Sequence, residues 1–178
     1  HLIDKGFSMK KRLSLIQMDV HVNEVEYNYA RVQELLSQAL SESPDIIVLP
    51  ETWNTGFHPS KDLINISDRN GERTKALLST FAKEHNVNIV GGSVAVAKED
   101  LVFNTSYAYN REGKLVGEYS KMHGFSPAKE DQYFASGTHT THFELDGIPC
   151  STVICYDIRF PELVRMAALS NTELLFVP

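Results

Sequence analysis

The chain has 178 residues, a length typical of one domain, and its 42% hydrophobic and 22% charged residues are typical of a folded globular protein. A formal net charge of -6 argues against nucleic acid as a partner, because phosphate binding requires Lys and Arg clustered on one face. Two cysteines are too few for a disulfide framework, so we expect a reduced, cytoplasmic setting.

The two ends of the chain set the expected domain boundaries. Residues 1–8 precede a Met-Lys-Lys run that is typical of a natural start, so we expect a short added extension ahead of one domain at 9–178. The apolar run at 173–178 is typical of a buried strand, and the sequence therefore predicts the N-terminal portion of a longer domain. We expect no membrane span and no signal peptide, because no apolar run has the required length.

The first half of the chain alternates strands and helices. Residues 13–18 predict a strand, and an Asn23-x-x-Glu26 capping box predicts the start of a helix. Residues 45–50, which are apolar after the initial Asp45, predict a strand that is covered on both faces. A second helix is predicted over 72–84, where apolar residues recur at helical spacing.

The second half of the chain is richer in strands. The pattern predicts a strand at 87–97, hairpins at 103–119 and 143–155, a helix at 160–169 and a final strand at 174–177. Crossover helices combined with hairpins favour an α/β fold with a mixed sheet and helices on its outer side.

Three polar residues lie at the ends of predicted core strands, where α/β folds place functional groups. Glu51 follows the strand at 45–50, Lys121 follows the second hairpin strand, and Cys155 ends a later strand. Each has an ordinary alternative when taken singly, namely a solvated carboxylate, a solvated lysine and a small core residue. Together they supply a base, a cation and a nucleophile.

Three motifs resemble those of the carbon–nitrogen hydrolases, also called the nitrilase superfamily. They are Leu-Pro-Glu-Thr-Trp at 49–53, Tyr-Ser-Lys-Met-His at 119–123 and Ile-Cys-Tyr-Asp-Ile-Arg-Phe-Pro-Glu-Leu at 154–163. The resemblance implies an αββα sandwich assembled from two protomers, a homodimer or larger oligomer, and catalysis without cofactor or metal. The motifs look most like those of the ω-amidase-like branch, which cleaves the terminal amide of small dicarboxylic acid monoamides such as 2-oxoglutaramate.

The resemblance also implies a role for each residue. Glu51 is the general base that takes the thiol proton of Cys155 and returns it to the leaving nitrogen. Lys121 and the backbone N–H of Tyr156 stabilise the oxyanion. We further expect the charge of Lys121 to favour the Cys155 thiolate, so that alkylation modifies Cys155 before Cys150.

A second glutamate, which orients the substrate and supports the lysine, is implied between the last two motifs. Glu130 is the natural match, although Asp131 beside it leaves the register open. A surface acidic pair in a polar loop is an equally good interpretation. For the whole chain, a nitrilase acting on a nitrile and a non-catalytic fragment or interaction module remain alternatives.

Several other residues are expected to be structural. Cys150 is interpreted as a core residue, and the Gly-Gly-Ser run at 91–93 indicates tight backbone packing rather than a phosphate loop. Arg159 is expected to pair with Glu162 and so hold the helix that follows Cys155. Trp53 either lines the pocket or covers the sheet edge.

Overall fold

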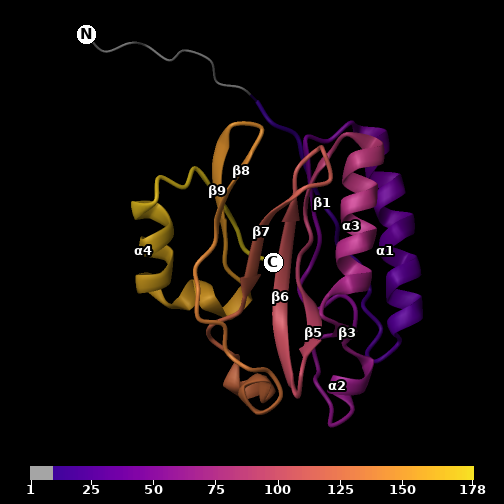
Figure 1. The fold of residues 1–178 in the computed structure, drawn as a ribbon, viewed down its shortest axis with the longest axis vertical. Helices are drawn as coiled ribbons and strands as arrows, with labels where there is room; N and C mark the ends of the chain where they lie inside the picture. The colour runs from indigo at the N-terminus through magenta and orange to yellow at the C-terminus, as the bar shows by residue number, and fades with distance from the viewer. Residues whose placement is uncertain (1–9) are drawn as a thin grey trace.

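The computed structural model describes residues 10–178, and the extension expected at 1–8 lies outside the described residues. The chain forms four layers, which run helix, sheet, sheet, helix from right to left in Figure 1. Helices α1 (Val25–Ala39) and α3 (Glu72–His85) form one outer layer, and α4 (Pro161–Leu169) forms the other. The αββα sandwich is thus confirmed, but a single chain supplies all four layers, so the expectation that two protomers assemble them is wrong.

The larger sheet has seven strands in the order β1-β2-β4-β6-β5-β3, with β7 also paired to β6. Parallel pairing joins β1 to β2, β2 to β4 and β3 to β5, whereas β6 is antiparallel to each of its partners. The mixed sheet predicted from the sequence is therefore confirmed. The strands are β1 (Leu13–Leu15), β2 (Ile46–Val48), β3 (Asp68–Arg69), β4 (Asn88–Val90), β5 (Val94–Lys98), β6 (Leu101–Tyr109) and β7 (Leu115–Ser120).

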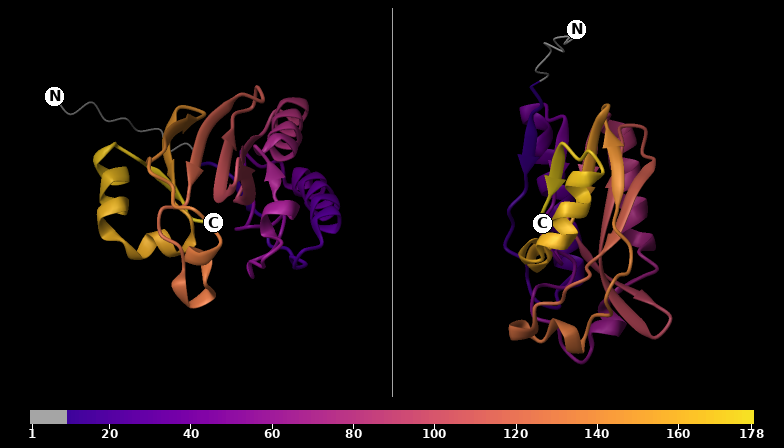
Figure 2. Two further views of the ribbon diagram at one scale, coloured as in Figure 1. Left: turned by 60° about the horizontal axis from the view of Figure 1, so that its bottom comes forward. Right: turned by 90° about the vertical axis from the view of Figure 1, so that its left-hand side faces the viewer.

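The smaller sheet contains the hairpin β8 (His142–Leu145) and β9 (Ile148–Thr152), with β10 (Leu174–Phe176) parallel to β9. The smaller sheet lies against the larger one, as Figure 2 shows, and apolar side chains of both sheets pack between them. The buried side chains between the sheets include Ile46, Val48, Val90, Phe143, Leu145, Cys150 and Phe176. The expectation that Cys150 is a core residue is confirmed, because it is 1% exposed.

Helices α1 and α3 each bury one apolar face against the other side of the larger sheet. The predicted capping box at the start of α1 is wrong, since Asn23 has a φ of 63° and no side chain caps the helix. The buried amide of Asn28 instead donates to the His21 carbonyl at 2.7 Å and accepts from the His21 N–H at 2.9 Å. This pair of hydrogen bonds fixes the chain where it enters the helix.

The remaining helices are short. They are α2 (Leu63–Ile66) and the 3-10 helices η1 (Leu40–Glu42), η2 (Ser126–Ala128), η3 (Glu130–Gln132) and η4 (Cys155–Arg159). Within residues 10–178, none of the helices combines the length and the apolar character needed to cross a membrane.

The predicted strand over 87–97 is in fact two strands, because the run at 91–93 breaks it into β4 and β5. Gly92 has a φ of 60°, and a Cβ atom there would lie 2.0 Å from the carbonyl oxygen of Pro50. The close approach confirms the expected tight backbone packing. It also places Gly92 against Pro50, the residue that immediately precedes Glu51.

Replacing Gly92 by Ala is expected to lower the free energy of unfolding by at least about 2 kcal/mol, because backbone strain and a steric clash add together. Gly147→Ala is the matched control, since Gly147 also has a positive φ, 79°, but a Cβ there would meet nothing within 4 Å. Denaturant unfolding of both variants measures the difference. Equal losses in the two variants would show that the contact with Pro50 is unimportant.

Candidate active site

The three candidate catalytic residues come from different parts of the two sheets. Glu51 lies three residues beyond β2, Lys121 directly follows β7, and Cys155 is the first residue of η4, three residues beyond β9. The structure brings them together where these strands end. This placement agrees with the expectation that functional groups lie at strand ends in α/β folds.

Lys121 is the centre of the site. Its side-chain nitrogen Nζ donates to Oε1 of Glu51 at 2.8 Å and to Oε2 of Glu130 at 2.7 Å, and the residue is only 4% exposed. Burial by itself lowers the pKa of Lys121, but the charge of Glu51 and the hydrogen bonds to both carboxylates outweigh it and raise the pKa above the ordinary value. The ammonium therefore stays charged at neutral pH.

Glu51 has a second partner that sequence analysis missed. Asn104 lies on β6 and is 1% exposed. Its side-chain Nδ2 donates to the same Oε1 atom of Glu51 at 3.0 Å, and its backbone carbonyl oxygen accepts from the Lys121 backbone N–H at 2.9 Å. Asn104 thus fixes both the carboxylate and the backbone of the lysine. The available signal was an Asn within a predicted strand, where Asn is rare.

The structure places Glu130, and not Asp131, against Lys121. Glu130 is 1% exposed, and its Oε2 atom also accepts from the Phe125 N–H at 2.8 Å, whereas Asp131 is exposed to solvent. The two short helices η2 and η3 turn the chain so that only the first of these acidic residues points inward. The interpretation as a surface acidic residue is therefore confirmed for Asp131, but it is wrong for Glu130, which is buried.

Cys155 begins η4 with a φ of 44°, in the left-handed region that is costly for a residue with a side chain. Its N–H donates to the carbonyl oxygen of Pro178 at 2.7 Å. The pKa of the thiol is raised to about 11, chiefly by burial and then by the negative charge of Glu51 and a hydrogen bond to it. The positive charge of Lys121 acts in the opposite direction and lowers this pKa. Lys121 does favour the thiolate, as expected, but the other effects prevail, so the thiol is neutral at rest and needs a base.

Iodoacetamide alkylation of Cys155 is expected to accelerate about tenfold per pH unit up to at least pH 10, because only the thiolate reacts and its pKa is about 11. The rate at each pH is measured by mass spectrometry of the peptide that contains Cys155. Cys150, whose pKa burial also raises to about 11, is the internal control, since it is fully enclosed and should remain unlabelled. A plateau below pH 8 would instead indicate a thiolate already formed in the resting protein.

Tyr156 follows the thiol directly. Its ring packs edge-on against Phe125 and Phe160, with centroid distances of 5.1 and 5.5 Å. Its N–H has no hydrogen-bond partner among residues 10–178, as is usual for the second residue of a helix. The Tyr156 N–H is therefore available for the oxyanion role that the resemblance implies.

Two further expectations are decided by the structure. Trp53 is fully buried in the core, and its Nε1 atom donates to the Gly91 carbonyl oxygen at 2.9 Å, so it belongs to the fold rather than to the pocket. The expected pair between Arg159 and Glu162 is wrong, because both are exposed and no ion pair joins these two described residues. In the described part of the chain, no group of His, Cys, Asp and Glu side chains is arranged to hold a metal ion.

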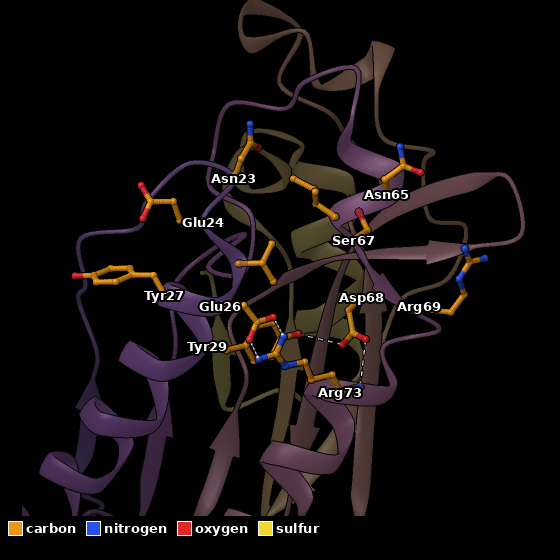
Figure 3. Close-up of a pocket in the computed structure, with 12 residues that line it drawn as sticks. Asn23, Glu24, Glu26, Tyr27, Tyr29, Asn65, Ser67, Asp68, Arg69 and Arg73 are labelled. Atoms are coloured by element: carbon orange, nitrogen blue, oxygen red, sulfur yellow. Dashed lines mark hydrogen bonds and ion pairs between the residues drawn. The ribbon is translucent and has the colours of Figure 1, made fainter.

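The large cavity drawn in Figure 3 lies apart from these residues. It has a volume of about 650 Å³ and is lined by the start of α1, the segment at 65–69 and Arg73. The guanidinium of Arg73 lies 3.8 Å from the centre of the Tyr29 ring and pairs with both carboxylate oxygens of Glu26. None of the candidate catalytic residues lines this cavity.

Comparison with known proteins gives matches over nearly the whole chain. A family model described as carbon-nitrogen hydrolase matches residues 12–178. The 2-oxoglutaramate amidase of Bacillus subtilis is 37% identical over 169 residues, covering 95% of this chain and 64% of that protein. An omega-amidase of Danio rerio is 30% identical over 177 residues, covering 95% and 63%.

The fold has counterparts among solved structures. An amidase from Nesterenkonia sp. superposes with a TM-score of 0.83 at 22% identity, covering 94% of this chain and 64% of that one. The chain thus spans somewhat less than two thirds of the length of these relatives.

Proposed function

Because the chain belongs to the carbon-nitrogen hydrolase family, we propose that it hydrolyses a small linear amide through a thioester on Cys155 and releases ammonia. The observation that carries the proposal is the buried contact of Lys121 with Glu51 and Glu130 beside the Cys155 thiol. A fixed cation between two carboxylates, next to a thiol, supplies the electrophile, base and nucleophile of acyl transfer.

Acylation begins with the neutral thiol. Glu51 accepts the proton of Cys155 as the sulfur attacks the carbonyl carbon, and a C–S bond forms. The negative charge that develops on oxygen accepts hydrogen bonds from the ammonium of Lys121 and from the N–H of Tyr156. The C–N bond then breaks, Glu51 returns the proton to the nitrogen, and ammonia leaves.

Deacylation uses the same groups with water as the nucleophile. Glu51 takes a proton from the water, whose oxygen attacks the thioester carbon, and the same two donors stabilise the second oxyanion. The C–S bond breaks, and the sulfur recovers its proton from Glu51 while the carboxylic acid departs. Glu130 keeps Lys121 in place throughout, because the two carboxylates hold the ammonium from two directions.

The proposed substrates are monoamides of small dicarboxylic acids, as in the ω-amidase-like branch. Support comes from the relatives of Bacillus subtilis and Danio rerio, which are named for 2-oxoglutaramate amidase and omega-amidase activity. The test is ammonia release from 2-oxoglutaramate, succinamate, butyramide and a matched nitrile, each with and without a chelator. We expect the monoamides to be cleaved fastest and the chelator to have no effect.

Other outcomes of this panel point to the alternatives. A preference for the nitrile would identify a nitrilase, and loss of activity in the chelator, restored by zinc, would contradict a metal-free mechanism. No ammonia from any substrate, together with unreactive Cys155, would favour a non-catalytic fragment or interaction module.

We also place the protein in the cytoplasm as a homodimer. A reducing compartment keeps the Cys155 thiol free, as the chemistry requires. Association is supported by exposed apolar side chains on η4 and α4, since Ile158, Met166 and Leu169 are 50%, 51% and 72% exposed. Molar mass from light scattering tests this, and a monomer at micromolar concentration would contradict it.

A further inference from the structure

Asp157 has an unusually complete set of hydrogen bonds for a buried carboxylate. It is 0% exposed, and its Oδ2 atom accepts from the hydroxyl of Tyr119 at 2.7 Å and from the N–H of Ile154 at 3.1 Å. Its Oδ1 atom accepts from the N–H of His123 at 2.9 Å and lies 2.8 Å from Nδ1 of the same residue. Neither oxygen of the carboxylate is left without a partner, although sequence analysis gave Asp157 no role.

These partners belong to the two segments that carry the candidate nucleophile and the candidate cation. Ile154 and Asp157 enclose Cys155, and the Asp157 N–H also donates to the Ile154 carbonyl oxygen at 3.0 Å, which closes the turn. Tyr119 and His123 lie two residues before and two residues after Lys121. One carboxylate therefore joins the Cys155 turn to the Lys121 segment.

The turn needs such support because its backbone is strained. The left-handed φ of Cys155 persists only where surrounding contacts enforce it. The ring of His123 adds a further contact, since it stacks on Phe160 with a centroid distance of 3.6 Å and an interplanar angle of 8°. Phe160 directly follows η4, so the same histidine contacts this short helix at its middle, through Asp157, and just beyond its end.

We propose that Asp157 is a positioning residue for the thiol of Cys155. Its hydrogen bonds to Tyr119 and His123 join the turn that carries Cys155 to the Lys121 segment. They thereby hold the thiol against Glu51 and Lys121. The proposal rests on the proposed function only in taking Cys155 as the nucleophile. Without these hydrogen bonds, the turn that carries Cys155 relaxes toward ordinary backbone angles, and the thiol moves away from Glu51 into solvent.

A purely structural role for Asp157 is the competing explanation, and the chain offers a matched control. Asp68 likewise accepts from a buried tyrosine hydroxyl, that of Tyr29 at 3.2 Å, and from the N–H groups of Arg73 and Thr74 at 3.2 and 2.8 Å. Figure 3 shows Asp68 beside Tyr29 and Arg73 in the cavity described above, which none of the candidate catalytic residues lines. Asp68→Asn therefore removes a comparable carboxylate without touching the Cys155 turn.

The experiment compares Asp157→Asn with Asp68→Asn in the chain of residues 1–178. Both are expected to lower the midpoint of denaturant unfolding. Only Asp157→Asn should raise the iodoacetamide rate of Cys155 at pH 8, by about tenfold, because the thiol leaves Glu51 and becomes more acidic. Only Asp157→Asn should also lower kcat, by about 100-fold with KM changed less than about threefold, because geometry at the reacting atoms is lost.

Opposite changes in alkylation and turnover are the signature that a structural role alone does not produce. Tyr119→Phe removes one donor only and should show the same two changes at smaller size, so it carries the test if Asp157→Asn does not fold. Alkylation rates in Asp157→Asn and Tyr119→Phe within twofold of Asp68→Asn would overturn the proposal. Faster alkylation in a chain that releases no ammonia would support the positioning role while the proposed function fails.

Discussion

Replacement of Lys121 by Met is expected to abolish amide hydrolysis and to lower the free energy of unfolding by about 3–5 kcal/mol. The change removes the ammonium that the buried carboxylates of Glu51 and Glu130 share, and leaves two negative charges facing each other away from water. Ammonia release and denaturant unfolding measure the two effects.

The matched control is Lys98→Met. Lys98 also pairs with a glutamate at 2.9 Å, that of Glu118, but both side chains are about 40% exposed, so the pair is screened by solvent. We expect this variant to lose less than about 1 kcal/mol and to keep its turnover. Similar stability losses in the two lysine variants would show that the buried ion pairs of Lys121 stabilise the fold no more than the exposed pair of Lys98 does.

The pH dependence of stability follows from the same residue. The pKa of Lys121 is higher in the folded protein than its ordinary value of 10.5. Its charged contacts therefore stabilise the fold in full below pH 10.5, and this contribution is lost as the pH rises through the folded value. Wild-type protein should lose stability in that alkaline range more steeply than Lys121→Met, which has no such group to deprotonate.

Replacement of Cys155 by Ala is expected to abolish ammonia release while changing the free energy of unfolding by less than about 1 kcal/mol. The thiol lies at the partly exposed start of η4, so its loss leaves no core cavity. Cys150→Ala is the complementary control, because this side chain is packed between the two sheets. It should cost about 1–2 kcal/mol and keep its turnover.

Mass spectrometry completes the test of the nucleophile. Glu51→Gln lacks the base for both acylation and deacylation, so an amide substrate should add acyl mass to the peptide that contains Cys155 only slowly and mainly at alkaline pH, where more of the thiol is ionised, and that mass should then persist. Turnover by Cys155→Ala, or preferential labelling of Cys150 in folded protein, would show that the assigned nucleophile is wrong.

Much of this arrangement could be predicted because it is set by local patterns. Apolar runs marked the strands, and a polar residue directly beyond such a run marked the edge of the sheet where Glu51 and Lys121 meet. The Asp-Gly turn at 146–147 predicted the β8–β9 hairpin. In each case the residues that decide the structure are neighbours in the sequence.

The errors arose where distant contacts decide. The strand over 87–97 looked continuous because both halves are apolar, and only the approach of Gly92 to Pro50 explains its break. Arg159 and Glu162 have the spacing of a helical pair, but α4 begins at Pro161, so the two residues are not on one helix. The pKa of Cys155 depends on charges from other elements, which no local pattern contains.

The pairing of β6 with β7 has a consequence for how this sequence tolerates insertions. Thr105 lies opposite Ser120, and this register places Asn104 and Lys121 at the same level beside Glu51. A slip of one residue turns every side chain of a strand to the opposite face. The irregular pairing between Ala108 and Tyr109 lies at the other end of the hairpin, next to the turn. Changes in turn length are therefore absorbed there, whereas a single residue added between 116 and 120 removes the lysine from the site.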